Sequence, residues 1–75
     1  MEIVINGAIF KEGKELYNTR IKRTLVCKKV LANHNKVTLF FIYPTISETQ
    51  YFAIDSRDLE DRIHKGIFRN DIPKK

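Results

Sequence analysis

Residues 20–43, RIKRTLVCKKVLANHNKVTLFFIY, carry the strongest structural signal in the chain. Apolar and polar side chains alternate over 20–32, as they do along a β-strand with one covered face. The apolar side holds Ile21, Leu25, Cys27 and Leu31, and the polar side holds Arg20, Lys22, Thr24 and Lys28. The residues that break the alternation are Arg23, Val26, Lys29 and Val30. A twist or a β-bulge accommodates such breaks, so we predict one long, irregular strand.

The second half of this segment predicts a central strand. Residues 33–36 are a polar turn, and 37–43 is apolar on both faces except at Thr38. A run of this kind suits a strand that is covered on both sides, in the middle of a sheet or in a closed barrel. Pro44 ends it, because proline cannot donate a hydrogen bond to a strand ladder.

Shorter strands flank this pair. The dipeptide Asn6-Gly7 tolerates the two positive φ angles of a type I′ turn, so we predict a hairpin of 2–5 with 8–11. After the central strand, 50–54 is a short strand rich in aromatic residues. Consecutive strands joined by short links favour an antiparallel meander.

The hydrophobic period changes to that of a helix at about 56–65. Asp55 or Ser56 caps its start, and Gly66 supplies the left-handed residue at its end. Leu59 and Ile63 form its buried stripe. Three acid-to-base pairs at i,i+4 support the helix: Asp58 with Arg62, Glu60 with His64, and Asp61 with Lys65. The residues that then pack back or add an edge strand are Ile67 and Phe68.

Together these elements predict a mainly β (α+β) fold. We expect a small antiparallel sheet of about five strands, open or curled into an SH3-like barrel, with one short C-terminal helix. The 75 residues make a single domain over 1–72, because a second core would leave each half below a stable size. Residues 73–75 are expected to form a flexible tail.

Cysteine content and the N-terminal sequence indicate a cytoplasmic protein. Cys27 is the single cysteine, so no internal disulfide can form. The first residues lack the basic start and the apolar run of a signal peptide. The longest uninterrupted apolar run, 39–43, is far shorter than the ~20 residues of a membrane helix. We therefore expect no membrane contact.

No group of residues predicts catalysis, a metal site or a cofactor. Cys27 with His34 or His64 is the one combination of nucleophile and base, but a mid-strand cysteine on an apolar face is usually a packing residue. One cysteine and two histidines without paired spacing do not make a zinc site. The acidic residues that serve as helix caps and surface pairs are Asp55, Asp58, Glu60 and Asp61. The sequence thus predicts a non-enzymatic binding domain.

The distribution of charge is the strongest functional signal. Residues 1–36 hold eight Lys or Arg against three acids, whereas 37–75 hold six of each, so the whole net charge of +5 belongs to the first half. No Asp or Glu occurs between Glu15 and Glu48. The cations in this window are Arg20, Lys22, Arg23, Lys28, Lys29 and Lys36. On a strand over 20–32, the side chains of Arg20, Lys22 and Lys28 would share one face and form a stripe that follows phosphates.

These observations leave two functions open. The first is nucleic-acid binding, with phosphates on the six cations and bases stacked on tyrosines; the stacking candidates are Tyr17, Tyr43 and Tyr51. Phe40, Phe41, Phe52 and at least some of these tyrosines are expected in the core. The alternative is a protein-binding module, such as a small phage or mobile-element inhibitor or adaptor. It would dock on an acidic protein surface or pair through an edge strand. Self-association into a homo-oligomer is compatible with either.

Overall fold

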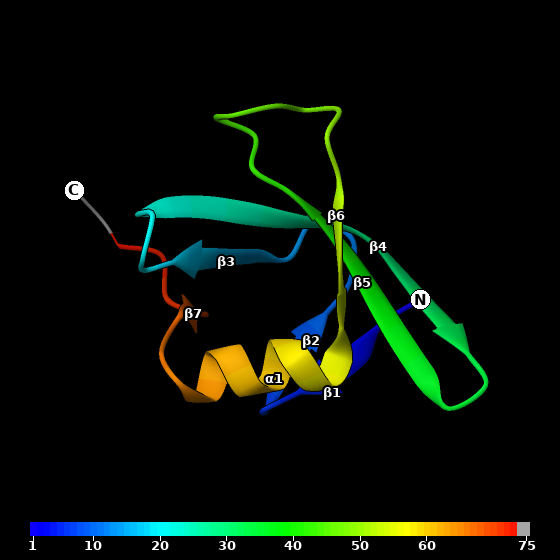
Figure 1. Cartoon of the computed structure of the whole chain (residues 1–75). Helices are drawn as coiled ribbons and strands as arrows, with labels where there is room; N and C mark the ends of the chain where they lie inside the picture. Colours follow the sequence, from blue (N-terminus) through cyan, green and yellow to red (C-terminus); the bar gives the residue numbers. More distant parts are fainter. Residues whose placement is uncertain (74–75) are drawn as a thin grey trace.

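The computed structural model describes residues 1–73, so the tail expected at 73–75 lies outside it apart from Pro73. In chain order the elements are β1 (Ile3–Ile5), β2 (Ala8–Phe10), β3 (Glu15–Asn18), β4 (Arg23–Asn33), β5 (Lys36–Ile42), β6 (Phe52–Asp55), α1 (Ser56–His64) and β7 (Phe68–Arg69). A two-stranded sheet pairs β1 with β2, and a five-stranded sheet has the order β6-β5-β4-β3-β7. Figure 1 shows α1 running from the end of β6 toward β7.

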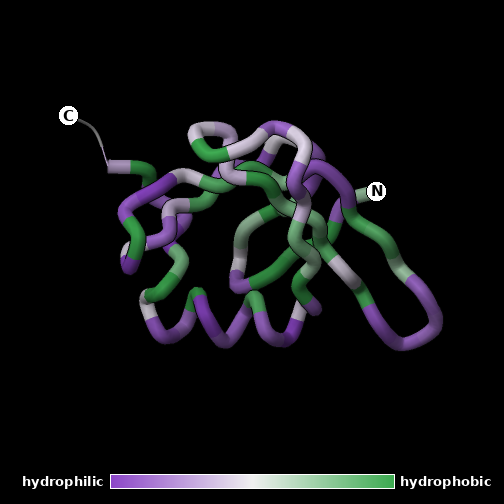
Figure 2. Tube along the Cα trace, turned by 45° about the horizontal axis from the view of Figure 1, so that its top comes forward, coloured by the Kyte–Doolittle hydropathy of each residue, from purple (hydrophilic) through white to green (hydrophobic). Residues whose placement is uncertain are grey.

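The predicted fold class is confirmed. Every strand pair is antiparallel, and the five-stranded sheet curls into a half-barrel, in agreement with a small SH3-like α+β fold. The β4–β5 hairpin projects beyond the rest of the molecule (Figure 1), and its end is hydrophilic (Figure 2). No helix within residues 1–73 combines the length and apolarity needed to cross a membrane.

One hydrophobic core joins the inner face of the half-barrel to α1 and to the β1–β2 hairpin. The side chains with at most 1% exposure are Phe10, Leu16, Leu25, Cys27, Leu39, Phe41, Leu59 and Phe68. Leu39 and Phe41 come from the same strand, two residues apart, and therefore point to the same side of the sheet. Each of the larger side chains stabilises the fold by roughly 1.5–3 kcal/mol through burial.

The predicted N-terminal hairpin is confirmed. Asn6 and Gly7 have φ angles of 54° and 82°, the two positive values of a type I′ turn. Phe10 places its ring fully in the core, whereas Val4 and Ile9 face each other on the exposed side.

The long strand β4 begins at Arg23, three residues later than the sequence predicted. Residues 19–22 form a turn instead, in which the Asn18 side chain accepts a hydrogen bond from the backbone N–H of Arg20 at 3.0 Å and Lys22 has a φ of 57°. Ile21 in this turn is 48% exposed, so its expected place on the apolar side is also wrong. An asparagine side chain that bonds its own neighbouring backbone competes with strand pairing at this point.

The predicted irregularity in β4 is a β-bulge. Cys27 pairs with Phe41 but Lys29 pairs with Phe40, so one extra residue is inserted between them. The insertion exchanges the two faces: Val30 becomes buried, and Leu31 turns outward with 43% exposure instead of lying on the apolar side.

The helix forms at the predicted place and is followed by the predicted edge strand. Asp55 caps α1, since its carboxylate accepts from the backbone N–H of Arg57 at 2.9 Å, and Leu59 is fully buried. Of the three expected i,i+4 pairs, the structure over residues 1–73 forms Asp61 with Lys65 at 2.9 Å. Phe68 opens β7, which pairs with β3.

We expect Asp55→Ala to destabilise the domain by about 1 kcal/mol. The substitution removes the acceptor for the Arg57 N–H at the start of α1, and loss of an N-cap typically costs this amount. Urea unfolding followed by circular dichroism measures the change. Asp55→Asn retains an accepting oxygen and should recover most of the loss, and equal destabilisation by both variants would contradict the capping role.

Candidate nucleic-acid interface

The six cations predicted to bind phosphate lie in three places rather than along one stripe. Arg20 and Lys22 are in the β3–β4 turn with Arg23 beside them, Lys28 and Lys29 are at the bulge, and Lys36 is at the end of the β4–β5 hairpin. All six are exposed. The expected sharing of one face by Arg20, Lys22 and Lys28 fails, because the strand begins only at Arg23.

The bulge places two lysines side by side on the outer face of the sheet. Cys27 and Val30, which flank them, are both buried in the core. Two residues of the bulged strand here oppose the single residue Phe40 on β5. Lys28 and Lys29 are therefore left on the side away from the core, both exposed to solvent.

Phe40 shares this outer face with the lysines. Its neighbours in the strand, Leu39 and Phe41, are fully buried, so alternation turns Phe40 away from the core. The ring is only partly buried, and it does not belong to the hydrophobic cluster or to the side chains packed against it. Lys29 lies directly opposite Phe40 across the β4–β5 pair. The prediction that Phe40 fills the core is therefore wrong.

Tyr51 adds a second aromatic ring to the outer face. It precedes Phe52, whose ring packs against the core, and it is 57% exposed. Ala53 is the partner of Phe40 on β6, so Tyr51 lies two residues from that partner, at the diagonal position where aromatic side chains come within reach. We call Lys28, Lys29, Phe40 and Tyr51 the lysine–aromatic patch.

The other two candidate tyrosines lie elsewhere. Tyr43 points inward, stacks on Phe52 with ring centroids 5.4 Å apart, and accepts a hydrogen bond on its hydroxyl from Asn18 at 2.9 Å. Tyr17 pairs with Thr24 and with Arg69, toward the β7 end of the sheet. Neither belongs to the lysine–aromatic patch.

Most of the six predicted cations are free of acidic partners. Within residues 1–73, five of the six predicted cations form no salt bridge: Arg20, Lys22, Arg23, Lys28 and Lys29. Lys36 makes one long contact, 3.9 Å to the Asp55 carboxylate, with 69% of its side chain exposed. An exposed pair of this kind stabilises little, so Lys36 can exchange its partner for a phosphate.

Cys27 lacks the surroundings of a nucleophile. It is fully buried, and burial raises the pKa of its thiol above the usual value of about 9.0, which suppresses the reactive thiolate. His34 in the β4–β5 turn and His64 at the end of α1 are both exposed. Among residues 1–73 no three His, Cys, Asp or Glu side chains gather to hold a metal ion.

We expect stability to fall as the pH rises above about 9, in part through Cys27. The folded state holds the thiol protonated, whereas the unfolded state releases its proton at a lower pH. The free energy of unfolding therefore falls as the pH rises from the unfolded pKa to the raised folded pKa. Below the unfolded pKa this contribution is fully present. Urea unfolding between pH 8 and 10 should show a steeper decline for the natural chain than for Cys27→Ala, and parallel curves would contradict it.

Comparison with known proteins assigns the chain to no family. No protein-family model, no curated protein and no solved structure matches the chain. The outer face of the sheet and the cavities of the fold are the features that bear on function.

Proposed function

We propose that this protein is a non-catalytic domain that binds single-stranded nucleic acid on the lysine–aromatic patch. The observation that carries the proposal is the bulge, which sets Lys28 and Lys29 together opposite the outward ring of Phe40. Phosphates would bind the two ammonium groups, and bases would stack on the rings of Phe40 and Tyr51. This combination of cations and aromatic faces is how sequence-tolerant single-strand binders act.

A single strand suits this surface better than a duplex. The faces of paired bases are covered by their neighbours in a double helix, whereas an unpaired base is free to stack on a protein ring. Phe40 is only partly exposed and lies within the sheet, so it presents a flat platform rather than a protruding wedge. Lys36 is on the same face beyond Thr38 and extends the phosphate path toward the hairpin end.

Binding to a labelled single-stranded oligonucleotide at several salt concentrations tests the proposal. With phosphates on Lys28, Lys29 and Lys36, log affinity should fall with log salt at a slope of about −2, from ~0.7 for each phosphate contact on a single strand. A duplex of the same sequence should bind more weakly. Absence of binding to the single strand at low salt would contradict the proposal.

A second candidate function, protein binding by strand addition, rests on the free edge of β4. β3 pairs with β4 only over 23–26. The contact extends to Cys27, whose carbonyl accepts from the Gly13 N–H and whose N–H donates to the Lys14 carbonyl. From Lys29 to Asn33 that edge has no strand neighbour among residues 1–73. An open edge of this kind can accept an extended segment of a partner.

Capture of partners from the native host with two baits tests this alternative. Ala32→Pro removes an N–H from the free edge, because residues 31 and 33 direct their backbone groups to β5 and residue 32 directs its own outward. A partner that pairs there should be lost with this bait. Capture of the same proteins by both baits, or of none by the natural chain, would contradict strand addition.

A further inference from the structure

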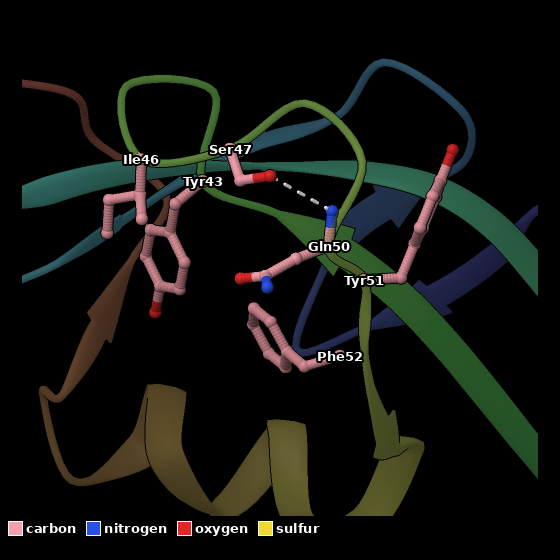
Figure 3. A pocket seen from close by; sticks show the side chains of 6 residues that line it. All are labelled: Tyr43, Ile46, Ser47, Gln50, Tyr51 and Phe52. Carbon is pink, nitrogen blue, oxygen red and sulfur yellow. Dashed lines mark hydrogen bonds between the residues drawn. The ribbon is translucent and has the colours of Figure 1, made fainter.

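A small aromatic pocket lies beneath the β5–β6 loop, on the inner side of the half-barrel. Its volume is about 200 Å³, below the ~300–1,000 Å³ of pockets for drug-sized molecules and suited to a single planar ring system. Its lining residues are Tyr43, Ile46, Ser47, Gln50, Tyr51 and Phe52. In Figure 3 the rings of Tyr43 and Phe52 border the cavity, whereas the ring of Tyr51 points away from them.

The walls of this pocket are held in place by the fold. The rings of Tyr43 and Phe52 lie 5.4 Å apart at an interplanar angle of 19°, and Phe52 also stacks on the buried Phe41 at 5.8 Å. The loop above is fixed by backbone bonds from Ile46 and Ser47 to the carbonyl of Tyr43, at 2.8 and 2.9 Å. The stacked rings therefore form one fixed aromatic wall, which a planar ligand can meet without any rearrangement of the loop.

Gln50 supplies a free hydrogen-bonding edge. Its backbone N–H is fixed to the Ser47 hydroxyl at 3.2 Å, while its side-chain amide forms no hydrogen bond among residues 1–73. Figure 3 shows this amide extending toward the space between Tyr43 and Phe52. A glutamine amide offers a donor and an acceptor side by side, and adenine presents the matching pair at N7 and its exocyclic amine.

Arg23 brings positive charge to the same loop. Its guanidinium donates to the Thr45 hydroxyl at 3.0 Å, and Thr45 directly precedes the pocket residue Ile46. Asn18 forms a second link, because it donates to the Tyr43 hydroxyl and accepts from the turn that carries Arg20 and Lys22. Arg23 forms no salt bridge within residues 1–73, so donors remain for an anion.

We propose that this pocket binds an adenine nucleotide, with the base between the aromatic walls and Gln50 and the phosphate on Arg23. The site uses Arg23, a cation that the lysine–aromatic patch leaves out, so it goes beyond the function proposed for that patch. The same chemistry is offered by free adenosine monophosphate and by the phosphorylated 5′ end of a strand that begins with adenosine.

Nuclear magnetic resonance titration of the natural chain with AMP tests the pocket. AMP should shift the resonances of Tyr43, Gln50 and Phe52, and should bind about tenfold more tightly than CMP, within the range of a bidentate contact. Adenosine, which lacks the phosphate, should bind more weakly than AMP. A short oligonucleotide with a 5′-phosphoadenosine, compared with AMP, identifies which of the two sources the site prefers.

Two exposed variants separate the parts of the site. Gln50→Ala should remove the preference for AMP over CMP, and Arg23→Ala should weaken AMP binding to the level of adenosine. Arg57→Ala on α1 is the matched control and should change neither property.

The proposal would be overturned if millimolar AMP failed to shift the resonances of the pocket residues. Equal binding of AMP and CMP would overturn it too. Binding of N-acetylphenylalanine amide in place of AMP would also overturn it and would assign the pocket to a peptide side chain. If variants of Lys28 and Lys29 leave oligonucleotide binding unchanged, that result contradicts the function proposed for the patch and not the pocket.

Discussion

Replacing Phe41 by alanine is expected to unfold the domain at room temperature. Its ring is fully buried in the core and stacks on Phe52 at 5.8 Å. A phenylalanine-to-alanine change in a core typically costs about 3–5 kcal/mol. A core in a domain of this size supplies a net stability of about the same magnitude. Far-UV circular dichroism at 25 °C should show loss of the strand signal in the variant.

Phe40 is the matched control for Phe41, because the two residues are adjacent on β5 and differ in the face they occupy. Phe40 lies outside the buried cluster, so Phe40→Ala should leave a folded domain with a smaller loss of stability. It should weaken single-strand binding by about 1–3 kcal/mol, the usual contribution of a stacking ring. Unfolding by Phe40→Ala together with a folded Phe41→Ala would reverse the two faces and contradict the fold.

Reversing the charge of both bulge lysines, Lys28→Glu with Lys29→Glu, should reduce single-strand affinity by about 60-fold at 50 mM salt. Each lost phosphate contact removes ~0.7 from the salt slope, which at this salt corresponds to about eightfold in affinity. The slope itself should fall from about −2 to about −0.7. Fluorescence anisotropy of a labelled oligonucleotide measures both quantities.

The control for this double variant carries the same change in net charge elsewhere. Lys11 and Arg57 are exposed, form no salt bridge within residues 1–73 and lie outside the patch. Lys11→Glu with Arg57→Glu should lower affinity far less than the bulge variant. An equal loss in both would show that binding follows the overall charge and not the patch.

The elements that depend on local chemistry could be predicted from the sequence. Asn6-Gly7 has the backbone freedom of a tight turn, Asp55 has an accepting side chain next to a helical pattern, and both occur where expected. The bulge was also predictable, because two lysines interrupt an apolar alternation that resumes at Val30. Each of these features is decided by residues that are close in the chain.

The features that depend on contacts between distant parts of the chain could not be predicted from the sequence. β4 starts at Arg23 because Asn18 binds the turn backbone and the Tyr43 hydroxyl, 25 residues away. The exposure of Phe40 depends on which face of the sheet stays uncovered, and an apolar run such as 37–43 contains no signal for that. The sequence therefore points to the tyrosines as stacking candidates, although the register places Phe40 directly opposite Lys29.

Mapping of amide chemical shifts with a single-stranded oligonucleotide tests the central claim most directly. The lysine–aromatic patch predicts that the largest shifts fall on residues 28, 29, 40 and 51, with α1 unchanged. Shifts confined to α1 or to the β1–β2 hairpin, or no shifts at all at low salt, would contradict it.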